Sequence, residues 1–520
     1  MRRRYDSRTS ESVDDRLPVS SSTLVAVPVA TPALPLVVGF DLDMTLIDSR
    51  PGIGAVLEVL ATELGVRLPV AELTARLGPP LDQMLAPHLP AHTLTAAVDR
   101  FREIYPSRAV AAATVLDGAH EAVAAVRAHR GRVLVVTGKF APNARLHLEH
   151  AGLDPDHLEG GVWGVGKADV LLRQGASVYV GDHVHDVEGA LAAGATSVSV
   201  LSGGCTREEL LAAGTHVVLD DLSAFPVWLE EHLLDQRLAA LAADLGRRGS
   251  LLVAYSGGAD SAFLLAAAVR ALGPGRVVAA TGYSDALPRS ERGPARQLAD
   301  ELGVRVLTPR TQEMEREGYR ANAGDRCFFC KAELLETLVP LAAQHRIAHV
   351  ATGTNADDVV AGFRPGIRAA AERGALTPLA DAGLTKAQVR EASRRWGLPT
   401  WDKPAAACLS SRIAYGIEVS PHRLARVERA EAAVREVLAA AGVPVRDLRV
   451  RDLGVREGRE VASVEVDAAL LAGRLAEPGA LVYDVCAAVR GAGFAVAEVS
   501  RRGFRSGSMN ELLTEPERWR

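Results

Sequence analysis

Short apolar runs alternate with longer amphipathic segments twice along the chain, and this alternation limits the fold more than any other feature. The runs are residues 36–40, 132–136 and 178–180 in the first series, and 251–255, 276–280 and 349–352 in the second. Apolar runs of this length indicate strands buried on both faces, and the segments between them are long enough for helices. Each series therefore predicts a doubly wound parallel α/β sheet with helices on both sides.

A chain of 520 residues is too long for one ordinary core. The two series share no detectable repeat, so we expect a fusion of unlike domains. Strand-like segments at 448–451 and 462–466 predict a smaller α+β piece near the C-terminus. The predicted parts are a disordered segment at 1–35, α/β domains at 36–233 and 234–400, and an α+β domain at 401–520.

Composition excludes several classes of protein. A net charge of -5 argues against a dedicated nucleic-acid binder, and five cysteines cannot form a disulfide framework. The sequence has no apolar run of the length of a membrane span, and its basic start is not followed by the apolar stretch of a secretory signal. We therefore expect a cytoplasmic protein that contacts neither membrane nor nucleic acid.

Polar side chains follow the apolar runs of the first series. They are Asp41, Asp43, Thr137, Lys167, Asp182 and Asp186. Because the carboxyl ends of parallel strands meet at one edge of a sheet, we expect these side chains to converge. Two carboxylates two residues apart can divide the roles of nucleophile and proton donor, and carboxylates from separate strands suit Mg²⁺.

These motifs resemble the haloacid dehalogenase superfamily over residues 36–225, with a helical cap at about 52–115. The resemblance implies a small-molecule phosphatase such as phosphoglycolate phosphatase, in which Asp41 is the nucleophile and Asp43 the general acid and base. Thr137 and Lys167 would stabilise the phosphoaspartate. Mg²⁺ would be held at the site formed by Asp41, Asp43, Asp182 and Asp186. Met44 stands where the family commonly has Gly, and the alternative is a domain retained for assembly with lapsed activity.

A glycine-rich turn follows the first strand of the second series. Its residues are Ser256, Gly257, Gly258, Ala259, Asp260 and Ser261, and a predicted helix at 262–272 comes next. Glycines let backbone N–H groups approach phosphate oxygens, and the helix N-terminus favours the anion. The turn lacks the Lys-Ser/Thr ending of a Walker loop. It resembles the PP-loop of ATP pyrophosphatases, which implies ATP binding and cleavage between the α- and β-phosphates.

Three of the five cysteines form a candidate ligand set. Cys327 and Cys330 lie three residues apart, and Cys408 follows about 80 residues later. From spacing alone the set fits a [4Fe–4S] cluster with one open iron, a zinc site or a redox dithiol. Cys205 and Cys486 are expected to be buried apolar side chains.

Several further motifs resemble the LarE family over residues 237–515. They are the runs at 325–331, 353–358, 363–366, 401–404, 407–412 and 503–510. This family consists of ATP-dependent sulfur transferases that build the nickel-pincer nucleotide cofactor. The resemblance implies that a pyridinium dicarboxylate mononucleotide is adenylated and that sulfur then displaces AMP to give a thiocarboxylate.

The same resemblance suggests roles for individual residues. Members with all three cysteines are similar to a cluster-bearing subgroup, whereas others sacrifice the sulfur of the cysteine that matches Cys408. This chain has all three, so the resemblance favours a [4Fe–4S] cluster held by Cys327, Cys330 and Cys408. Arg449 and Arg451 would bind the substrate phosphate, and Glu465 is either a site carboxylate or a solvated strand residue. Arg364, Arg412 and Arg505 are either ligand contacts or salt-bridge partners. The family also suggests a homo-oligomer such as a ring-like hexamer, with transient contacts to other proteins of pincer-cofactor synthesis.

Two other functions compete with this interpretation. A PP-loop tRNA thiolase can also use three cysteines and a cluster, but it should show a basic surface or an RNA-binding module. A scaffold that binds ATP without sulfur transfer is the non-enzymatic alternative.

Overall fold

The computed structural model of the protein describes residues 36–75, 77–361, 365–404, 407–476 and 478–505. The segment predicted to be disordered, 1–35, lies outside these residues. So do Phe363 and Arg364 of one family motif and residues 506–510 of another.

The first series of strands forms a six-stranded parallel sheet in the order β5-β4-β1-β6-β7-β8. Its strands are β1 (Val37–Phe40), β4 (Arg132–Thr137), β5 (His157–Gly160), β6 (Val178–Gly181), β7 (Thr196–Val200) and β8 (Val217–Leu219). β1, β4 and β6 coincide with the three predicted apolar runs to within a residue or so. Residue by residue, their side chains alternate between two cores, because successive residues of a strand point to opposite faces.

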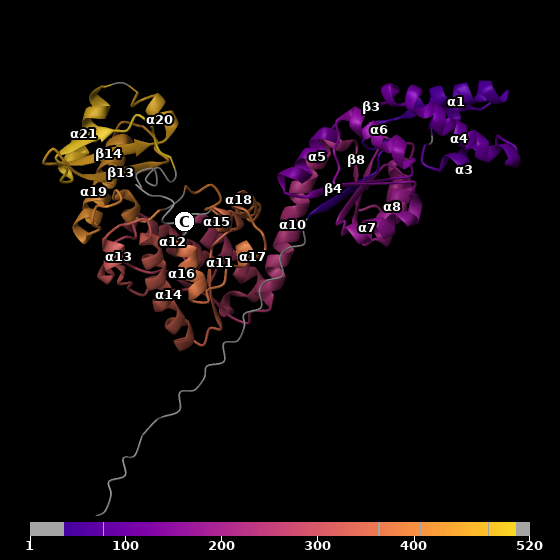
Figure 1. The fold of residues 1–520 in the computed structure, drawn as a ribbon. Coiled ribbons are helices and arrows are strands. Elements are labelled where there is room, and N and C mark those ends of the chain that lie inside the picture. The colour runs from indigo at the N-terminus through magenta and orange to yellow at the C-terminus, as the bar shows by residue number, and fades with distance from the viewer. Residues whose placement is uncertain (1–35, 76, 362–364, 405–406, 477, 506–520) are drawn as a thin grey trace, which may run out of the picture. The chain divides into compact units, whose positions relative to one another are not determined.

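Helices cover both faces of this sheet, as Figure 1 shows for α5 and α10 on one side and α7 and α8 on the other. The first face packs against α5 (Ala119–Ala128), α6 (Ala141–Ala151) and α10 (Phe225–Gly246). The second face packs against α7 (Lys167–Gln174) and α8 (Val184–Ala192). The arrangement is the doubly wound one that the alternation predicts.

A helical insertion follows β1 and has a hydrophobic core of its own. It contains α1 (Arg50–Leu64), α2 (Val70–Ala75), α3 (Leu81–Leu85) and α4 (Ala91–Arg108). The short strands β2 (Ile47–Asp48) and β3 (Thr114–Val115) pair antiparallel where the chain enters and leaves it. This insertion lies where the cap was predicted.

The second series forms a four-stranded parallel sheet in the order β11-β10-β9-β12. Its strands are β9 (Leu251–Ala254), β10 (Val277–Ala280), β11 (Arg305–Leu307) and β12 (His349–Thr352). One face packs against α11 (Ala259–Leu272), α12 (Arg289–Glu301) and α18 (Lys386–Arg395). The other packs against α14 (Arg326–Gln344) and α16 (Pro365–Glu372).

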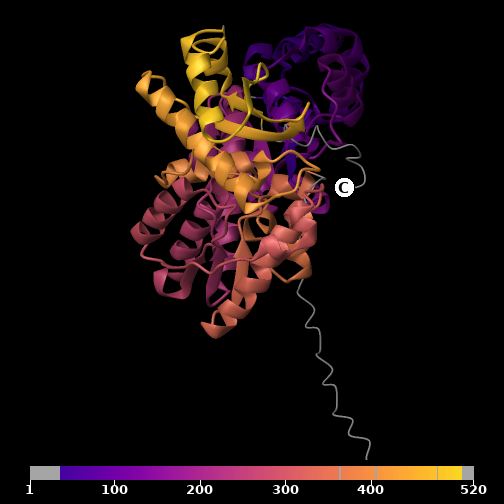
Figure 2. The ribbon, with the colours of Figure 1, turned by 90° about the vertical axis from the view of Figure 1, so that its left-hand side faces the viewer.

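The C-terminal part contains a three-stranded sheet covered by two long helices. The strands β13 (Leu448–Arg456) and β14 (Arg459–Val466) are antiparallel, and β15 (Val496–Val499) runs parallel to β14. The helices α19 (Pro421–Ala440) and α21 (Ala480–Gly491) pack on one face and appear in orange and yellow in Figure 2. Two parallel sheets and a small α+β part confirm the predicted fold class.

The predicted boundary at 233/234 falls inside one continuous helix, α10. Leu229 and Leu233 of this helix belong to the core of the first sheet, whereas Leu234 and Leu241 belong to the core of the second. Among the described residues, every helix is too short or too polar to cross a membrane.

Candidate active sites

In each parallel sheet the strand order changes direction at one strand, and polar residues follow that strand in the sequence. β1 lies between β4 and β6, and Asp41 follows it directly. β9 lies between β10 and β12, and the turn from Ser256 to Ser261 follows it. Ligands of open α/β sheets bind at such switch points, so the chain has two candidate sites.

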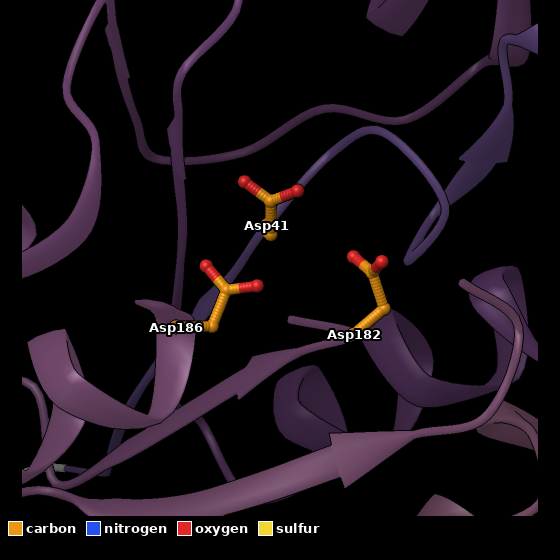
Figure 3. Close-up of side chains that lie close together, drawn as sticks. All are labelled: Asp41, Asp182 and Asp186. Carbon is orange, nitrogen blue, oxygen red and sulfur yellow. The ribbon is translucent and has the colours of Figure 1, made fainter. Parts of the chain in front are cut away.

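Three carboxylates meet at the first site. Asp41, Asp182 and Asp186 are buried and offer ligand oxygens that lie within 4.8 Å of one another (Figure 3). The Lys167 Nζ lies 2.7 Å from Asp41 Oδ1 and 2.6 Å from Asp186 Oδ1. Oxygen ligands from separate strand ends are the set that Mg²⁺ prefers, so these residues fit a magnesium ion.

The burial and close approach of these carboxylates raise the pKa of two of them. Burial raises the pKa of Asp41 to about 7, although the Lys167 ammonium opposes the shift. Burial and the neighbouring carboxylates Asp186 and Asp41 raise the pKa of Asp182 well above its ordinary value. Carboxylates held this close favour a bound cation or a shared proton.

Asp43 lies outside this triad, in a pair with a cation. Its Oδ1 accepts hydrogen bonds from Lys139 Nζ, at 2.6 Å, and from the Ser49 hydroxyl. Burial acts to raise the pKa of Asp43, but the Lys139 ammonium and the Ser49 hydroxyl lower it overall. Asp43, predicted to contribute to the magnesium site, thus directs its carboxylate to Lys139, two residues beyond Thr137.

Sequence reasoning missed Lys139 and the residues around it. Lys139 Nζ lies 5.0 Å from the ring centre of Tyr105, a cap residue whose hydroxyl is 2.9 Å from His147 Nε2. Burial and the Lys139 charge lower the pKa of His147 to about 4, which keeps it neutral. The sequence Thr137-Gly138-Lys139 was the available signal, since a residue in the same turn as Thr137 reaches the same site.

The second site is built on the turn after β9. Gly257 has φ +72°, and a Cβ there would lie 2.6 Å from the Cβ of Ala295, so only glycine fits. Ser261 Oγ lies 3.1 Å from Ser256 Oγ and donates to the Gly258 carbonyl at 3.1 Å. These bonds fix the turn at the N-terminus of α11, where backbone N–H groups attract phosphate.

Polar groups around this turn point to a ligand. Asp260 Oδ1 is buried without a hydrogen-bond partner among the described residues, and burial raises the pKa of this carboxyl. Lys403 Nζ donates to the Gly257 carbonyl at 2.9 Å and to Glu291 Oε2 at 2.6 Å. A buried carboxylate oxygen without a partner is costly, and a cation carried by the nucleotide would satisfy it.

The turn and two of the cysteines line one cavity of about 370 Å³. Cys330, near the start of α14, and Cys408 both border it together with Ser256, Asp260 and Ser261. Burial raises the pKa of Cys330 well above its ordinary value, and the nearby thiols Cys408 and Cys327 and the carboxylate of Glu313 add to the shift. The exposed Cys327 does not line the cavity.

The three thiols are close without forming a single-ion site. Among the described residues, only the aspartate triad brings three ligand atoms of His, Cys, Asp or Glu within 4.8 Å of one another. Three thiolates are a suitable ligand set for a [4Fe–4S] cluster.

Hydrogen bonds hold the Cys408 segment against α14. Arg326 Nη1 donates to the Ser410 carbonyl at 2.8 Å, and the hydroxyls of Tyr319 and Ser410 are bonded. Asn322 Nδ2 donates to the carbonyls of Ala414 and Ile417, both at 2.8 Å. These contacts join segments about 90 residues apart in sequence, which is why sequence patterns do not reveal them.

The two halves of the chain are similar to different known proteins. Residues 38–190 match the family of haloacid dehalogenase-like hydrolases, and residues 166–225 match a second, HAD-hydrolase-like model. The phosphoglycolate phosphatase of Rhodospirillum rubrum is 31% identical over 221 residues, which cover 38% of this chain and 91% of that protein. A solved haloacid dehalogenase-like hydrolase from Streptococcus pneumoniae covers 38% of this chain with 20% identity and a TM-score of 0.35.

The rest of the chain has other relatives. An uncharacterized protein of Synechocystis is 35% identical over 283 residues, 54% of this chain and all of that protein. The pyridinium-3,5-bisthiocarboxylic acid mononucleotide synthase of Lactiplantibacillus plantarum, a LarE protein, is 30% identical over 286 residues, 55% of this chain and 97% of the synthase. The chain belongs to the LarE family. Its N-terminal half is a haloacid dehalogenase-like phosphatase domain.

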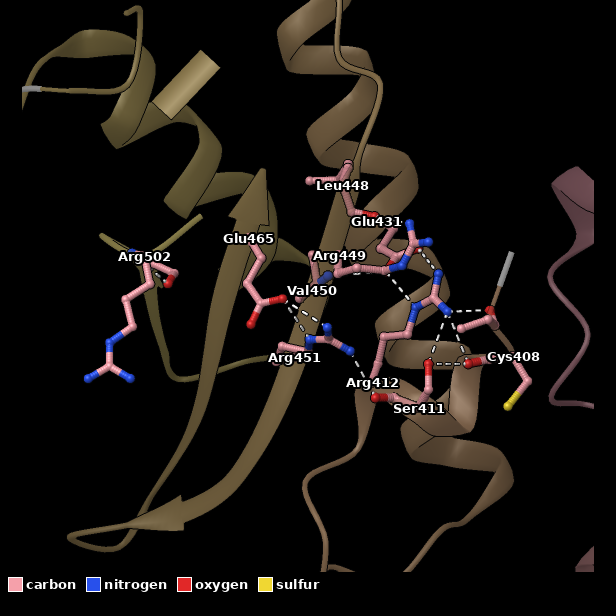
Figure 4. Close-up of polar contacts among 12 residues, drawn as sticks. Cys408, Ser411, Arg412, Glu431, Leu448, Arg449, Val450, Arg451, Glu465 and Arg502 are labelled. Atoms are coloured by element: carbon pink, nitrogen blue, oxygen red, sulfur yellow. Dashed lines mark hydrogen bonds and ion pairs between the residues drawn. The ribbon is translucent and has the colours of Figure 1, made fainter. Parts of the chain in front are cut away.

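In the LarE half, the predicted phosphate-binding arginines lie on the β13 face opposite the core, and both are buried (Figure 4). Arg451 Nε donates to Glu465 Oε2 at 3.0 Å, and its Nη1 donates to the Ser411 carbonyl at 2.9 Å. Burial and the charge of Arg412 lower the pKa of Arg449 to about 10. Glu465 is thus an ion-pair partner rather than a solvated strand residue.

Arg412 connects these arginines to the cysteine segment. Its Nε donates to Glu431 Oε1 at 2.9 Å, and its Nη1 donates to the Cys408 carbonyl at 3.0 Å (Figure 4). Arg412 is therefore a salt-bridge partner that also fixes the backbone of Cys408. The guanidinium groups of Arg449, Arg451 and Arg412 lie beside this segment, those of Arg451 and Arg412 in ion pairs with Glu465 and Glu431, and guanidinium groups are suited to an anionic ligand.

Proposed function

We propose that the LarE half is an ATP-dependent sulfur transferase that converts the carboxylates of a pyridinium dicarboxylate mononucleotide into thiocarboxylates. The observation that carries the proposal is the shared cavity: the PP-loop, Cys330 and Cys408 border the same 370 Å³ space. A site that activates a carboxylate with ATP and then delivers sulfur needs both groups around one substrate. The 30% identity to the Lactiplantibacillus plantarum synthase supports the same reaction.

The residues divide the work into two steps. In the first, a substrate carboxylate oxygen attacks the α-phosphorus of ATP, and the bond to pyrophosphate breaks. N–H groups of the PP-loop stabilise the charge that develops on the phosphates, and Asp260 holds the cation that accompanies them. In the second, sulfur attacks the acyl carbon and AMP leaves, with Cys408 at the cavity wall.

Cys327, Cys330 and Cys408 would hold the [4Fe–4S] cluster, which when bound supplies labile sulfide at its open iron. The other source of sulfur is Cys408 itself, by cleavage of its Cβ–Sγ bond. Reconstitution with iron and sulfide without oxygen tests the cluster. Visible absorption of a cluster that is lost in Cys327→Ala supports it, whereas bound zinc without this absorption contradicts it.

The decisive experiment measures pyrophosphate and thiocarboxylate separately. Asp260→Asn and Ser256→Ala should abolish pyrophosphate formation, because both act on the nucleotide. Cys408→Ala should still form pyrophosphate but no thiocarboxylate. Wild-type protein that binds ATP without turning it over would make the LarE half a scaffold, and co-purifying RNA that becomes thiolated would make it a tRNA thiolase.

For the N-terminal half we propose a Mg²⁺-dependent phosphatase. Asp41 attacks the phosphorus and Asp43 protonates the leaving oxygen, while Lys167 neutralises charge beside Asp41. Mg²⁺, held by Asp41, Asp182 and Asp186, supplies charge stabilisation of the transferring phosphoryl group when bound. Asp41→Asn should abolish release of phosphate from phosphomonoesters, and equal activity of this variant and wild type would contradict the assignment.

We further propose a cytoplasmic homo-oligomer, with a hexamer as the expected state, that acts on small molecules and contacts other pincer-cofactor proteins transiently. Light scattering of the purified chain tests the oligomeric state. A monomer at micromolar concentration would contradict it.

A further inference from the structure

The cavity of the phosphatase domain is larger and more aromatic than a two-carbon phosphate ester requires. Its volume is about 490 Å³, within the range that encloses a drug-sized ligand. Four of its 29 lining residues are Phe, Tyr or Trp, although these residues make up only 4% of the chain. Such a lining favours a substrate with a planar apolar body.

Trp163 is the aromatic residue placed best to contact that body. Its loop is tied to the turn after β4, because Val162 N–H donates to the Thr137 carbonyl at 3.0 Å and Gly161 N–H donates to the Lys139 carbonyl at 2.8 Å. A Cβ on Gly138 would lie 3.5 Å from the Trp163 ring. The indole therefore lies directly beside the turn that carries Thr137 and Lys139.

Two histidines extend the indole into an aromatic shelf, defined here as Trp163, His183 and His185. The ring centres of Trp163 and His185 are 4.0 Å apart, and those of His183 and His185 are 4.9 Å apart and stacked. His183 directly follows Asp182, which places the shelf next to the aspartate triad.

The cap also lines this cavity. A Cβ on Gly78 would lie 2.9 Å from the His183 ring, so the cap approaches the shelf closely at this point. Beyond Gly78 the cap contributes the apolar side chains of Leu81, Met84 and Phe101 to the cavity lining, and also polar ones, Asp82, Thr95, Asp99 and Arg102. An aromatic shelf with apolar side chains in the same cavity is an arrangement that binds nucleic-acid bases by stacking, and polar groups beside it can contact the edges of a base.

We propose that the phosphatase domain hydrolyses nucleoside 5′-monophosphates, with the base on the aromatic shelf and the phosphate at Asp41. The inference rests on the proposed phosphatase and transferase activities. The second of these releases AMP and starts from a pyridinium mononucleotide, and both compounds are phosphomonoesters with a planar ring. The fusion then joins an enzyme that makes and uses nucleotides to one that removes their phosphate.

The step balances without an added reagent other than water. The Asp41 carboxylate oxygen bonds to phosphorus, the bond from phosphorus to the 5′-oxygen breaks, and Asp43, which enters this step in its protonated form, gives its proton to the departing 5′-oxygen. Water then attacks the phosphoaspartate, Asp43 takes its proton, and Asp41 is restored. The products are one nucleoside and one inorganic phosphate.

The test compares kcat/KM of the full-length enzyme with Mg²⁺ for AMP, nicotinate mononucleotide and 2-phosphoglycolate. We expect at least one nucleotide to exceed 2-phosphoglycolate by about tenfold or more. Trp163→Leu should lower the ratio of nucleotide to 2-phosphoglycolate about tenfold, the loss of one stacking contact, and Trp163→Phe should restore most of it. Trp228→Leu, on α10 and outside the cavity lining, is the matched control.

The outcomes separate the two proposals. A preference for 2-phosphoglycolate, or a Trp163→Leu variant in which all esters fall equally, overturns the nucleotide inference and leaves the phosphatase assignment standing. Release of phosphate from no ester, p-nitrophenyl phosphate included, overturns both. Whichever nucleotide is preferred, AMP or the pyridinium compound, identifies the source of the substrate.

Discussion

At the scale of single residues, Met44 beside the phosphatase site has a strained backbone conformation. Met44 follows Asp43 and has φ +59°, in the left-handed region that favours glycine. Its side chain is 2% exposed and belongs to the core of the cap. Burial of the side chain, worth about 2 kcal/mol, offsets a backbone cost of about 1–2 kcal/mol, so Met in place of Gly links the catalytic turn to the cap.

Met44→Gly should therefore lower the free energy of unfolding slightly, by about 1 kcal/mol, because the lost burial exceeds the relieved strain. Denaturant unfolding followed by Trp fluorescence measures it. Met44→Leu keeps the burial and the strain, and should remain within about 0.5 kcal/mol of wild type. A Met44→Gly variant more stable than wild type would show that the side chain contributes little.

Lys167 gives a prediction with a pH dependence. It is 2% exposed and is the cation between Asp41 and Asp186, so Lys167→Met leaves buried carboxylates without their partner. Without Mg²⁺ we expect a loss of about 3 kcal/mol near pH 8. Because the pKa of Asp41 is already raised to about 7, and rises further in the variant, protonation stabilises the folded variant as pH falls.

The deficit of Lys167→Met relative to wild type should thus be smaller at pH 5.5 than at pH 8, by the linkage between protonation and folding. Urea unfolding in EDTA at the two pH values measures both. An equal deficit at the two values would mean that lost packing, rather than uncompensated charge, causes the instability.

At the scale of secondary-structure elements, the site in the LarE half depends on the connection between α14 and the segment that follows Cys408. Asn322, which precedes α14, makes this connection with its side-chain amide and is fully buried. Its φ is +53°, a conformation that Asn adopts more readily than most residues. One residue therefore satisfies two distant carbonyls and closes a tight turn.

Asn322→Ala should destabilise the protein by about 3 kcal/mol, since it removes the amide that donates to the Ala414 and Ile417 carbonyls and puts Ala, which adopts the left-handed region less readily than Asn, at this position. Asn322→Gly loses the same hydrogen bonds without the strain and should lose about 1 kcal/mol less. Chemical denaturation of both variants compares them. If Ala and Gly are equally destabilising, the backbone conformation at this position carries no cost.

Sequence patterns predicted the elements better than the side-chain partners. The runs 132–136, 251–255 and 349–352 coincide with β4, β9 and β12 because strands of a doubly wound sheet are apolar on both faces. The helix predicted at 262–272 begins earlier, at Ala259, since the PP-loop already has helical backbone from that residue. Strands β5, β7 and β11 were not predicted from the sequence, because these strands are shorter or more polar than the apolar runs on which the predictions rest.

The partners that shape the sites were not predictable in this way. Lys139, Asn322 and Lys403 each act on a residue 90 or more positions away. Nothing in local periodicity encodes such a contact, which depends on how the loops fold over the sheet. Asp41, Asp182 and Asp186 could be grouped because each follows a strand or begins a helix at the same sheet edge.

At the scale of the whole molecule, the two parallel sheets place their candidate sites in the same way. In each parallel sheet the first strand is flanked by later strands on both sides, and the residues after it form the candidate site. One turn presents the carboxylate of Asp41, and the other presents the backbone N–H groups of the PP-loop. The chain therefore has two candidate active sites with different functional groups.

Two sites predict two separable activities. Asp41→Asn should abolish phosphate release and leave pyrophosphate formation within about twofold of wild type, and Asp260→Asn should do the reverse. Assays of both products on both variants make the comparison. If either substitution abolished both activities in folded protein, the two sites would not be independent.

The central claim, that sulfur supplied at Cys408 or at a cluster that it holds replaces AMP on an adenylated carboxylate, is tested most directly by mass spectrometry of the protein and the product after one turnover. With Mg·ATP and the pyridinium dicarboxylate mononucleotide, the product should gain one sulfur for each oxygen lost. Cys408 should either remain intact when a reconstituted cluster supplies sulfide or become dehydroalanine when it does not. Formation of AMP and pyrophosphate with no sulfur in the product, and Cys408 unchanged, would contradict the claim.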